Sequence, residues 1–162
     1  MAVIKEKSVL AALLKRMYWI EAEMEQLGTW EARIQFMGEN IEALEKLSHD
    51  SDKHWNILQK WLLIADIPIP MTAPPGLPAK IFDFNGMPPE RIFHEIMKYE
   101  ILARDAYVDI LNADSAVIED LFPDEINRTE FIQDIKVLIK DEEEHRKICV
   151  KQSGNLKIIK TG

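Results

Sequence analysis

The acidic run at residues 141–145, which ends in His145, lies in a segment with a clear helical period. At 100° per residue, Glu142 and His145 fall on the inward, apolar stripe of that helix, whereas Glu143 and Glu144 point away from it. The other members of the stripe are apolar: Phe131, Ile135, Leu138 and Cys149. Burying an unpaired carboxylate or imidazole costs free energy. The pair therefore indicates either a buried Glu–His hydrogen bond that stiffens the core or a metal site.

Three other segments with helical period also carry a polar residue on an apolar stripe. Glu21 lies among Leu14, Met17 and Met24, and Glu100 lies between Ile96 and Ala103. His54 lies on a stripe that runs from Leu44 to Leu62. Glu23 and Glu25 stand within a turn of Glu21, so the choice among these three glutamates stays open at this point. His49 and His94 do not fall on an apolar stripe and are expected at the surface.

Residues 66–87 separate the first two predicted helices from the last two. Five prolines and two glycines in this stretch exclude a helix. The stretch is longer than an antiparallel helical hairpin needs, and it can span a helix of about 35 Å at ~3.3 Å per residue. We therefore interpret it as a crossover between two helices that run the same way. A disordered linker is the alternative, but apolar residues favour packing: Ile67, Ile69, Ile81, Phe82 and Phe84.

The chain of 162 residues is predicted to form one all-α domain, residues 1–162. Its helices are expected at about 8–37, 41–65, 88–112 and 129–151, with the crossover at 66–87. Pro88 and Pro89 open the third helix, and Thr129 is predicted to cap the fourth. A short helical turn is expected after Ser115.

The two helical pairs have similar patterns. Met17, Glu21 and Met24 match Ile96, Glu100 and Ala103 at an offset of 79. In the second helix of each pair, the matched residues are 91 positions apart: Asp50 with Asp141, Ser51 with Glu142, and His54 with His145. The two offsets differ by 12 residues, which predicts a longer loop between the helices of the second pair. Each pair thus has one inward Glu on its first helix and one inward His on its second.

These residues resemble the ferritin-like superfamily, and rubrerythrin-like proteins most closely. The most specific elements are Glu142-x-x-His145 and Glu100 followed by Tyr107. The resemblance implies a four-helix bundle with a long connection between its second and third helices, and a two-metal site at mid-bundle. It implies Fe, or Mn or Zn, held by five ligands: Glu21, His54, Glu100, Glu142 and His145. Tyr107, the candidate catalytic residue, would either donate to a metal-bound carboxylate or be an ordinary core tyrosine. Asp50 and Asp141 would either support the ligand histidines or be solvated.

Ser51 stands where the family pattern has a sixth ligand, a glutamate. A hydroxyl cannot supply a bridging negative charge, so three outcomes follow: an asymmetric two-metal site, a single-metal site beside Glu142 and His145, or no metal. By resemblance, the function is oxidoreductase chemistry on peroxide, O2 or ferrous iron, as in rubrerythrin-like peroxidases and oxidases. The alternative is a non-catalytic helical-bundle interaction protein with a degenerate or single-metal site.

Composition narrows the expected partners. A net charge of −8 argues against nucleic-acid binding. The single cysteine, Cys149, excludes an internal disulfide and a four-cysteine iron centre, so turnover would need an external redox donor. No run of 18 apolar residues is present, and the run 9–14 is too short for a signal peptide, so we expect a cytoplasmic protein that does not enter a membrane. The resemblance also implies a homodimer.

Overall fold

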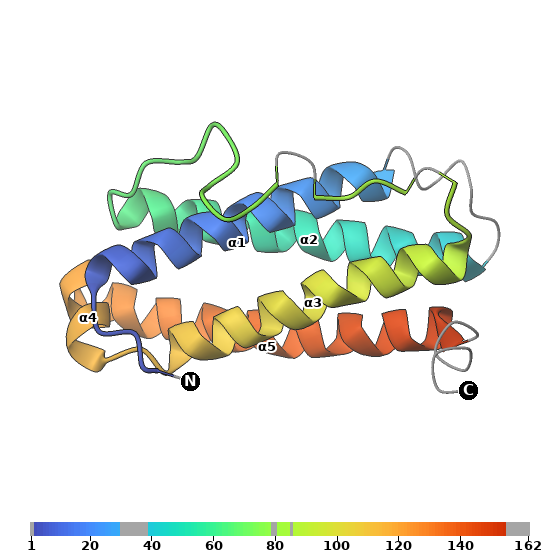
Figure 1. Ribbon diagram of the computed structural model, residues 1–162. Coiled ribbons are helices and arrows are strands. Elements are labelled where there is room, and N and C mark those ends of the chain that lie inside the picture. The colour runs from blue at the N-terminus through green and yellow to red at the C-terminus, as the bar shows by residue number, and fades with distance from the viewer. Residues whose placement is uncertain (1, 30–38, 79–80, 85, 155–162) are drawn as a thin grey trace.

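The computed structural model describes residues 2–29, 39–78, 81–84 and 86–154. This part of the chain contains five α-helices and no β-strand, so the predicted all-α class is confirmed (Figure 1). The helices are α1 (Lys7–Thr29), α2 (Glu39–Ile64), α3 (Pro89–Leu111), α4 (Ser115–Leu121) and α5 (Glu125–Gln152). The expected end of the first helix near residue 37 lies outside the described residues.

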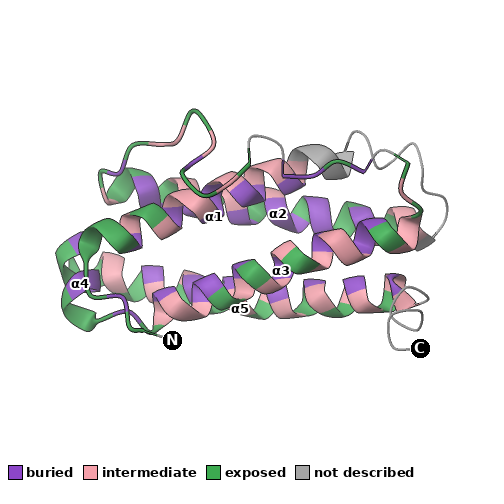
Figure 2. Cartoon of the chain, in the orientation of Figure 1, coloured by how far each residue is buried: buried purple, intermediate pink, exposed green. Residues whose placement is uncertain are grey.

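The four long helices form two closely packed pairs, α1 with α2 and α3 with α5. In Figure 1, α1 and α5 run in one direction along the molecule, and α2 and α3 run in the opposite direction. Further contacts join α2 to α5 and α1 to α3, so the two pairs share one core. Figure 2 shows the buried faces of these helices turned toward one another. Most of the burial comes from apolar stripes, which stabilise the helices far more than local propensity does.

The start of α5 differs from the prediction that Thr129 caps the last helix. The helix begins one turn earlier, at Glu125, because the carboxylate of Asp124 accepts a hydrogen bond from the backbone N–H of Asn127 at 3.0 Å. The Thr129 hydroxyl instead donates to the carbonyl of Glu125 within the helix. Asp124 therefore caps the helix in place of Thr129.

Residues 112–124 contain the short helix α4 that the sequence indicated after Ser115. Asp114 caps it by accepting a hydrogen bond from the N–H of Ala116 at 3.0 Å. Val117, Ile118 and Leu121 are buried. The longer loop expected within the second helical pair is thus the connection that carries α4.

The described residues between α2 and α3 form neither helix nor strand, yet they pack on the core. Ile67, Ile81, Phe82 and Phe84 are buried, and Ile69 is partly buried. The ring of Phe82 lies 5.0 Å from that of Tyr99 on α3. These contacts give the segment a fixed position against the helices rather than the behaviour of a free linker.

Across the described residues, no helix is both long enough and apolar enough to cross a bilayer.

Candidate metal centre

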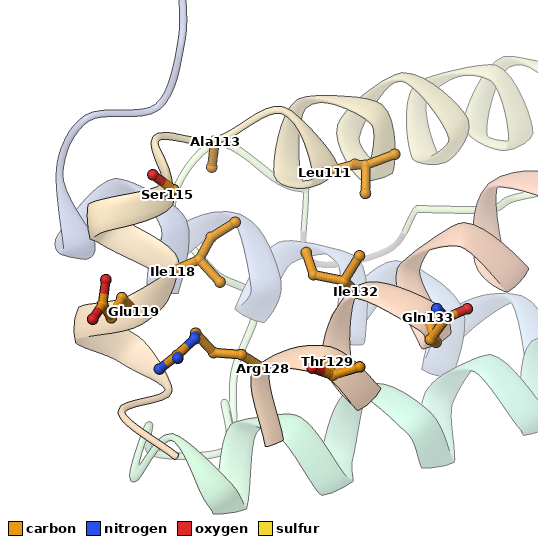
Figure 3. Close-up of a pocket in the computed structure, with 9 residues that line it drawn as sticks. All are labelled: Leu111, Ala113, Ser115, Ile118, Glu119, Arg128, Thr129, Ile132 and Gln133. Atoms are coloured by element: carbon orange, nitrogen blue, oxygen red, sulfur yellow. The ribbon is translucent and has the colours of Figure 1, made fainter. Parts of the chain in front are cut away.

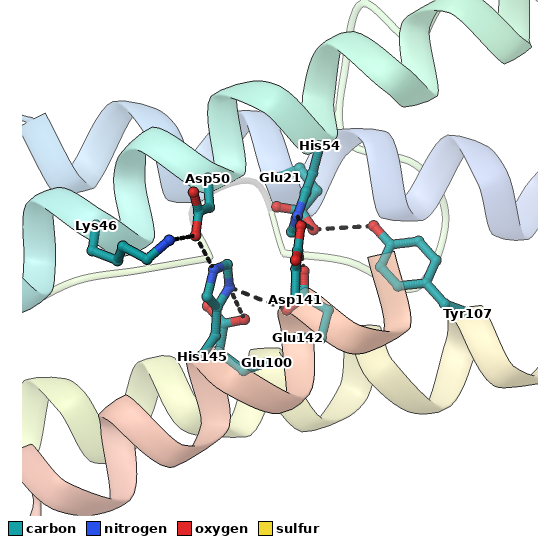
Figure 4. A network of polar contacts seen from close by, with 9 residues as sticks. All are labelled: Glu21, Lys46, Asp50, His54, Glu100, Tyr107, Asp141, Glu142 and His145. Carbon is teal, nitrogen blue, oxygen red and sulfur yellow. Dashed lines mark hydrogen bonds and ion pairs between the residues drawn. The ribbon is translucent and has the colours of Figure 1, made fainter. Parts of the chain in front are cut away.

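Polar side chains from all four long helices meet inside the core, at the level of residues 142–145 of α5 (Figure 4). Each of them is at most 3% exposed. They are Glu21 of α1, His54 of α2, Glu100 and Tyr107 of α3, and Glu142 and His145 of α5. The structure therefore brings all six predicted site residues to one place. Of the three candidate glutamates on α1, only Glu21 is buried, since Glu23 and Glu25 are partly exposed.

The imidazole of His54 contacts carboxylates through both ring nitrogens. Its Nδ1 lies 3.3 Å from Glu21 Oε1 and 2.9 Å from Glu142 Oε1. The contact with Glu142 is short but is not a hydrogen bond, and Glu142 Oε1 has no hydrogen-bond partner. On the other side of the ring, Nε2 lies 3.0 Å from Asp141 Oδ2.

His145 has the corresponding surroundings. Its Nδ1 lies 3.1 Å from Glu100 Oε2 and 3.7 Å from Glu142 Oε2, and its Nε2 lies 2.9 Å from Asp50 Oδ2. The rings of His54 and His145 stack, with centroids 5.5 Å apart. Glu142 therefore reaches toward both imidazoles, one with each oxygen.

Carboxylates lie at both nitrogens of each ring, with the aspartates on the outer side. An ionised carboxylate can only accept hydrogen bonds, so Nε2–H of His54 donates to Asp141 and Nε2–H of His145 donates to Asp50. The glutamates face Nδ1 on the inner side, so a metal ion would bind Nδ1 in place of the proton that this nitrogen shares with them. This arrangement, in which a carboxylate fixes the tautomer and orientation of a histidine, is the usual support of a metal-ligating imidazole.

The aspartates differ in their own surroundings. Lys46 Nζ lies 2.6 Å from Asp50 Oδ2. Burial raises the pKa of Asp50, but the contacts with Lys46 and His145 outweigh it and leave that pKa below its usual value. The hydrogen bond from His54 likewise lowers the pKa of Asp141. Sequence reasoning missed Lys46; its only signal was its position one turn before Asp50, where a lysine is ordinarily a solvated residue.

Tyr107 supports the α1 glutamate. It is fully buried, and its hydroxyl donates a hydrogen bond of 3.0 Å to Glu21 Oε1. Burial, together with the charge of Glu21, raises the pKa of Tyr107 well above its usual value. The phenol therefore stays protonated and remains a hydrogen-bond donor.

Several buried oxygen atoms in this cluster lack a hydrogen-bond partner. They are Glu100 Oε1, Glu142 Oε1 and the hydroxyl oxygen of Ser51, which is 1% exposed. Buried polar groups without partners are rare in folded proteins and call for a ligand, an ion or water. In addition, His54, Glu142 and His145 each offer an atom within 4.8 Å of the others, a spacing that suits a shared metal ion. Imidazole nitrogens with carboxylate oxygens suit Fe, Mn or Zn, so the residues present fit such a metal.

Protons balance the cluster in the metal-free protein. Burial lowers the pKa of His145, but the carboxylates of Glu100 and Glu142 outweigh it and raise the pKa to about 11. Burial also lowers the pKa of His54, and its carboxylate neighbours, Glu21 first, raise it well above 6.5. Burial and the charge of Glu142 raise the pKa of Glu100. A metal ion would have to displace these protons to bind.

The remaining histidines lie outside the cluster. His49 is exposed and His94 is partly exposed. Ser51, at the α2 position that matches Glu142, faces the cluster layer from a buried position without contributing a charge.

A surface pocket of about 440 Å³ lies away from this centre, between α4, the start of α5 and the end of α3 (Figure 3). Its walls include Ile118, Ile132 and Arg128. The Arg128 guanidinium donates hydrogen bonds to the carbonyls of Phe122 and Pro123, at 3.0 and 2.8 Å, so it fastens the loop that leads into α5. The pocket is lined by neither imidazole nor thiol, and it lacks the donor set of a metal site.

Neither a scan against protein-family models nor searches of curated proteins and solved structures give a match to this chain.

Proposed function

We propose that this chain is a metal-binding protein of the ferritin-like type, similar to rubrerythrins, with a two-metal centre of iron or manganese. The proposed activity is oxidoreductase chemistry on peroxide, O2 or ferrous iron. The observation that carries the proposal is the pair of buried imidazoles, His54 and His145, each oriented through Nε2 by an aspartate so that Nδ1 faces buried glutamates.

We infer a ferritin-like four-helix bundle made of α1, α2, α3 and α5. The close packing of α1 with α2 and of α3 with α5 supports this inference, as does the common direction of α2 and α3 (Figure 1). In this arrangement the proline-rich residues 66–87 are the crossover between the two pairs. The pairwise match of the helices explains why each pair brings a glutamate of its first helix and a histidine of its second helix to the same level.

The proposed ligands divide between the two pairs. Glu21 and His54 would hold one metal position and Glu100 and His145 the other, while Glu142 lies within reach of both imidazoles. A single ion would instead be shared by His54, Glu142 and His145. The bound metal ions would supply redox chemistry and open coordination positions. The chain contributes a buried, water-poor site, and Tyr107 holds Glu21 in place through its hydroxyl.

The alternative function is a non-catalytic interaction protein in which the same residues only stabilise the core. One observation favours it: both ring nitrogens of each buried histidine face carboxylates. Protons alone can then balance most of the charge. The absence of a glutamate at position 51 also removes one negative charge that a second divalent ion would use.

Metal analysis separates the two functions. Protein purified without added metal or chelator is expected to contain Fe, Mn or Zn, and His145→Ala is expected to lower the occupancy. The matched control is His94→Ala, on α3 but outside the cluster. Equal metal content in both variants would remove His145 from the ligands, and metal-free protein that cannot be loaded would favour the interaction protein.

Redox activity needs a separate measurement. The single cysteine leaves no rubredoxin-type centre in this chain, so the proposal includes an external electron donor and, from the resemblance, a homodimer. A loaded protein that neither oxidises ferrous iron nor consumes peroxide or O2 with an added reductant would keep the metal site but reject the oxidoreductase.

A further inference from the structure

A small apolar cavity lies one helical turn from the candidate metal centre. Its walls include Met24 of α1, Leu44 and Leu47 of α2, and Ile96 of α3. Phe82 and Phe84, from the segment between α2 and α3, complete it. It leaves about 10 Å³ for the centre of a water-sized molecule, which is close to the smallest space that can hold a single such molecule.

Helical spacing connects this cavity with the metal centre. Met24 follows Glu21 by three residues, Leu47 precedes Ser51 by four, and Ile96 precedes Glu100 by four. Residues three or four apart lie on the same helix face. Because α1 runs opposite to α2 and α3, these three steps all lead toward the same end of the molecule (Figure 1). The cavity is therefore the layer next to the glutamates.

Ser51 lies between the cavity and the carboxylates on the α2 face. Its side chain is short, 1% exposed and without a hydrogen-bond partner. The glutamate that the matching position 142 carries would extend further into the same space. Ser51 is not itself part of the cavity wall, but it places no carboxylate between the cavity and the metal centre.

The chemistry of the cavity wall selects the ligand. Among the described residues that line the wall, one has a polar side chain, Ser48, and its hydroxyl already donates to the carbonyl of Glu25 at 3.1 Å. A molecule that needs hydrogen bonds would lose them on entering, at a cost in free energy. Ferrous ion and hydrogen peroxide are both strongly hydrated, whereas dioxygen is small, uncharged and apolar.

We propose that this cavity binds dioxygen beside the metal centre, on the side of Ser51. The use of the bound gas in a reaction rests on the proposed function. Binding itself depends only on the cavity and occurs in the metal-free protein as well. Of the three substrates considered above, the cavity favours O2.

The test uses NMR of the full chain in its metal-free form under dissolved dioxygen, whose paramagnetism speeds the relaxation of nearby methyl groups. The methyls of Met24 and Ile96 are expected to relax severalfold faster with dioxygen than those of Ile135, which is fully buried on α5 and does not line the cavity. Leu44→Ala should enlarge the effect, and Leu44→Phe should reduce it. Equal enhancement at Met24, Ile96 and Ile135 would overturn the proposal.

A second measurement examines peroxide. Hydrogen peroxide oxidises accessible methionines to sulfoxides. Met24, which lines the cavity, is expected to react as slowly as the fully buried Met17, while the exposed Met71 reacts quickly. Oxidation of Met24 well ahead of Met17 would show that peroxide enters the cavity and would refute its selectivity. Failure to find metal would leave both results unchanged, so the two proposals fail separately.

Discussion

Asp50 on α2 accepts a hydrogen bond from Nε2 of His145 on α5, at 2.9 Å, although a histidine of its own helix stands one turn away. The reverse pairing also exists, since Asp141 on α5 accepts from His54 on α2 at 3.0 Å. The second helix of each repeated pair thus supplies the aspartate that contacts the histidine of the other, which is an exchange of aspartates between α2 and α5 (Figure 4). Each imidazole is fixed from the opposite helix, so α2 and α5 must be packed before either ring is oriented.

Asp50→Asn tests the effect of this exchange on metal binding. The amide can still accept a hydrogen bond but carries no charge, so Nδ1 of His145 becomes a weaker ligand for a metal ion. Loss of such a supporting partner typically lowers metal affinity by ~10–100-fold. Titration of the metal-free protein with Mn(II) or Co(II) measures the change. Asp52→Asn is the control, since Asp52 is a partly exposed residue of the same helix. The same loss in both variants would show that only the net charge matters.

Helical period was sufficient to locate the polar layer. Glu21, Glu100, Glu142 and His145 occupy inward positions that follow from local geometry alone, and all are at most 3% exposed. The choice among Glu21, Glu23 and Glu25 needed the structure, because the burial of each glutamate depends on where the neighbouring helices pack.

The exchange of aspartates could not be predicted from the sequence. Asp50 and Asp141 each stand four residues before a histidine of their own helix, which favours a local interpretation. Which histidine each contacts depends on the relative position of α2 and α5. The start of α5 was missed for a local reason: Asp124 and Thr129 both have capping side chains, and Asp124 is the one that caps.

Tyr107→Phe removes one hydroxyl and leaves Glu21 without that donor. In the metal-free protein, an unsatisfied buried acceptor should cost ~1–3 kcal/mol in the free energy of unfolding. The metal position beside Glu21 should also bind more weakly, because the carboxylate loses its fixed orientation. Chemical denaturation and metal titration measure the two effects. Tyr99→Phe is the control, since Tyr99 is a partly buried tyrosine that packs on Phe82. Unchanged stability and affinity in Tyr107→Phe would make the phenol an ordinary core residue.

The metal-free protein is expected to lose stability as the pH rises above neutrality. The folded-state pKa of His145 is about 11, above its ordinary value of 6.5. A raised pKa means that the folded state holds the proton more tightly, so this stabilisation is complete below pH 6.5 and declines as the pH rises toward 11. Glu100, whose pKa is also raised, acts in the same direction. Thermal melts of chelator-treated protein between pH 7 and 9.5 should show a falling Tm.

His145→Gln is expected to reduce that pH dependence, because the neutral amide has no proton to lose, while His54 and Glu100 still contribute. His49→Gln, at an exposed position of α2, should retain the wild-type slope. Saturation with metal should also flatten the slope, since the metal replaces the titrating protons. A Tm that rises between pH 7 and 9.5 in the metal-free protein would contradict the protonated cluster.

The last prediction concerns Ser51, the position where the repeated pairs differ in a candidate ligand. Glu21, Glu100 and Glu142 supply three carboxylates, fewer than the four that would balance two divalent ions. The missing charge is on α2, so we expect weaker binding beside Glu21 and His54 than beside Glu100 and His145. Anaerobic titration with Fe(II) or Mn(II) should give two unequal affinities, or a single metal per chain. Ser51→Glu should strengthen the weaker position, and Ser48→Glu, one turn away at a buried site of the same helix, should not. Two equal affinities in the natural protein would show that another group, such as Asp50, Glu25 or a ligand from solution, replaces the absent glutamate.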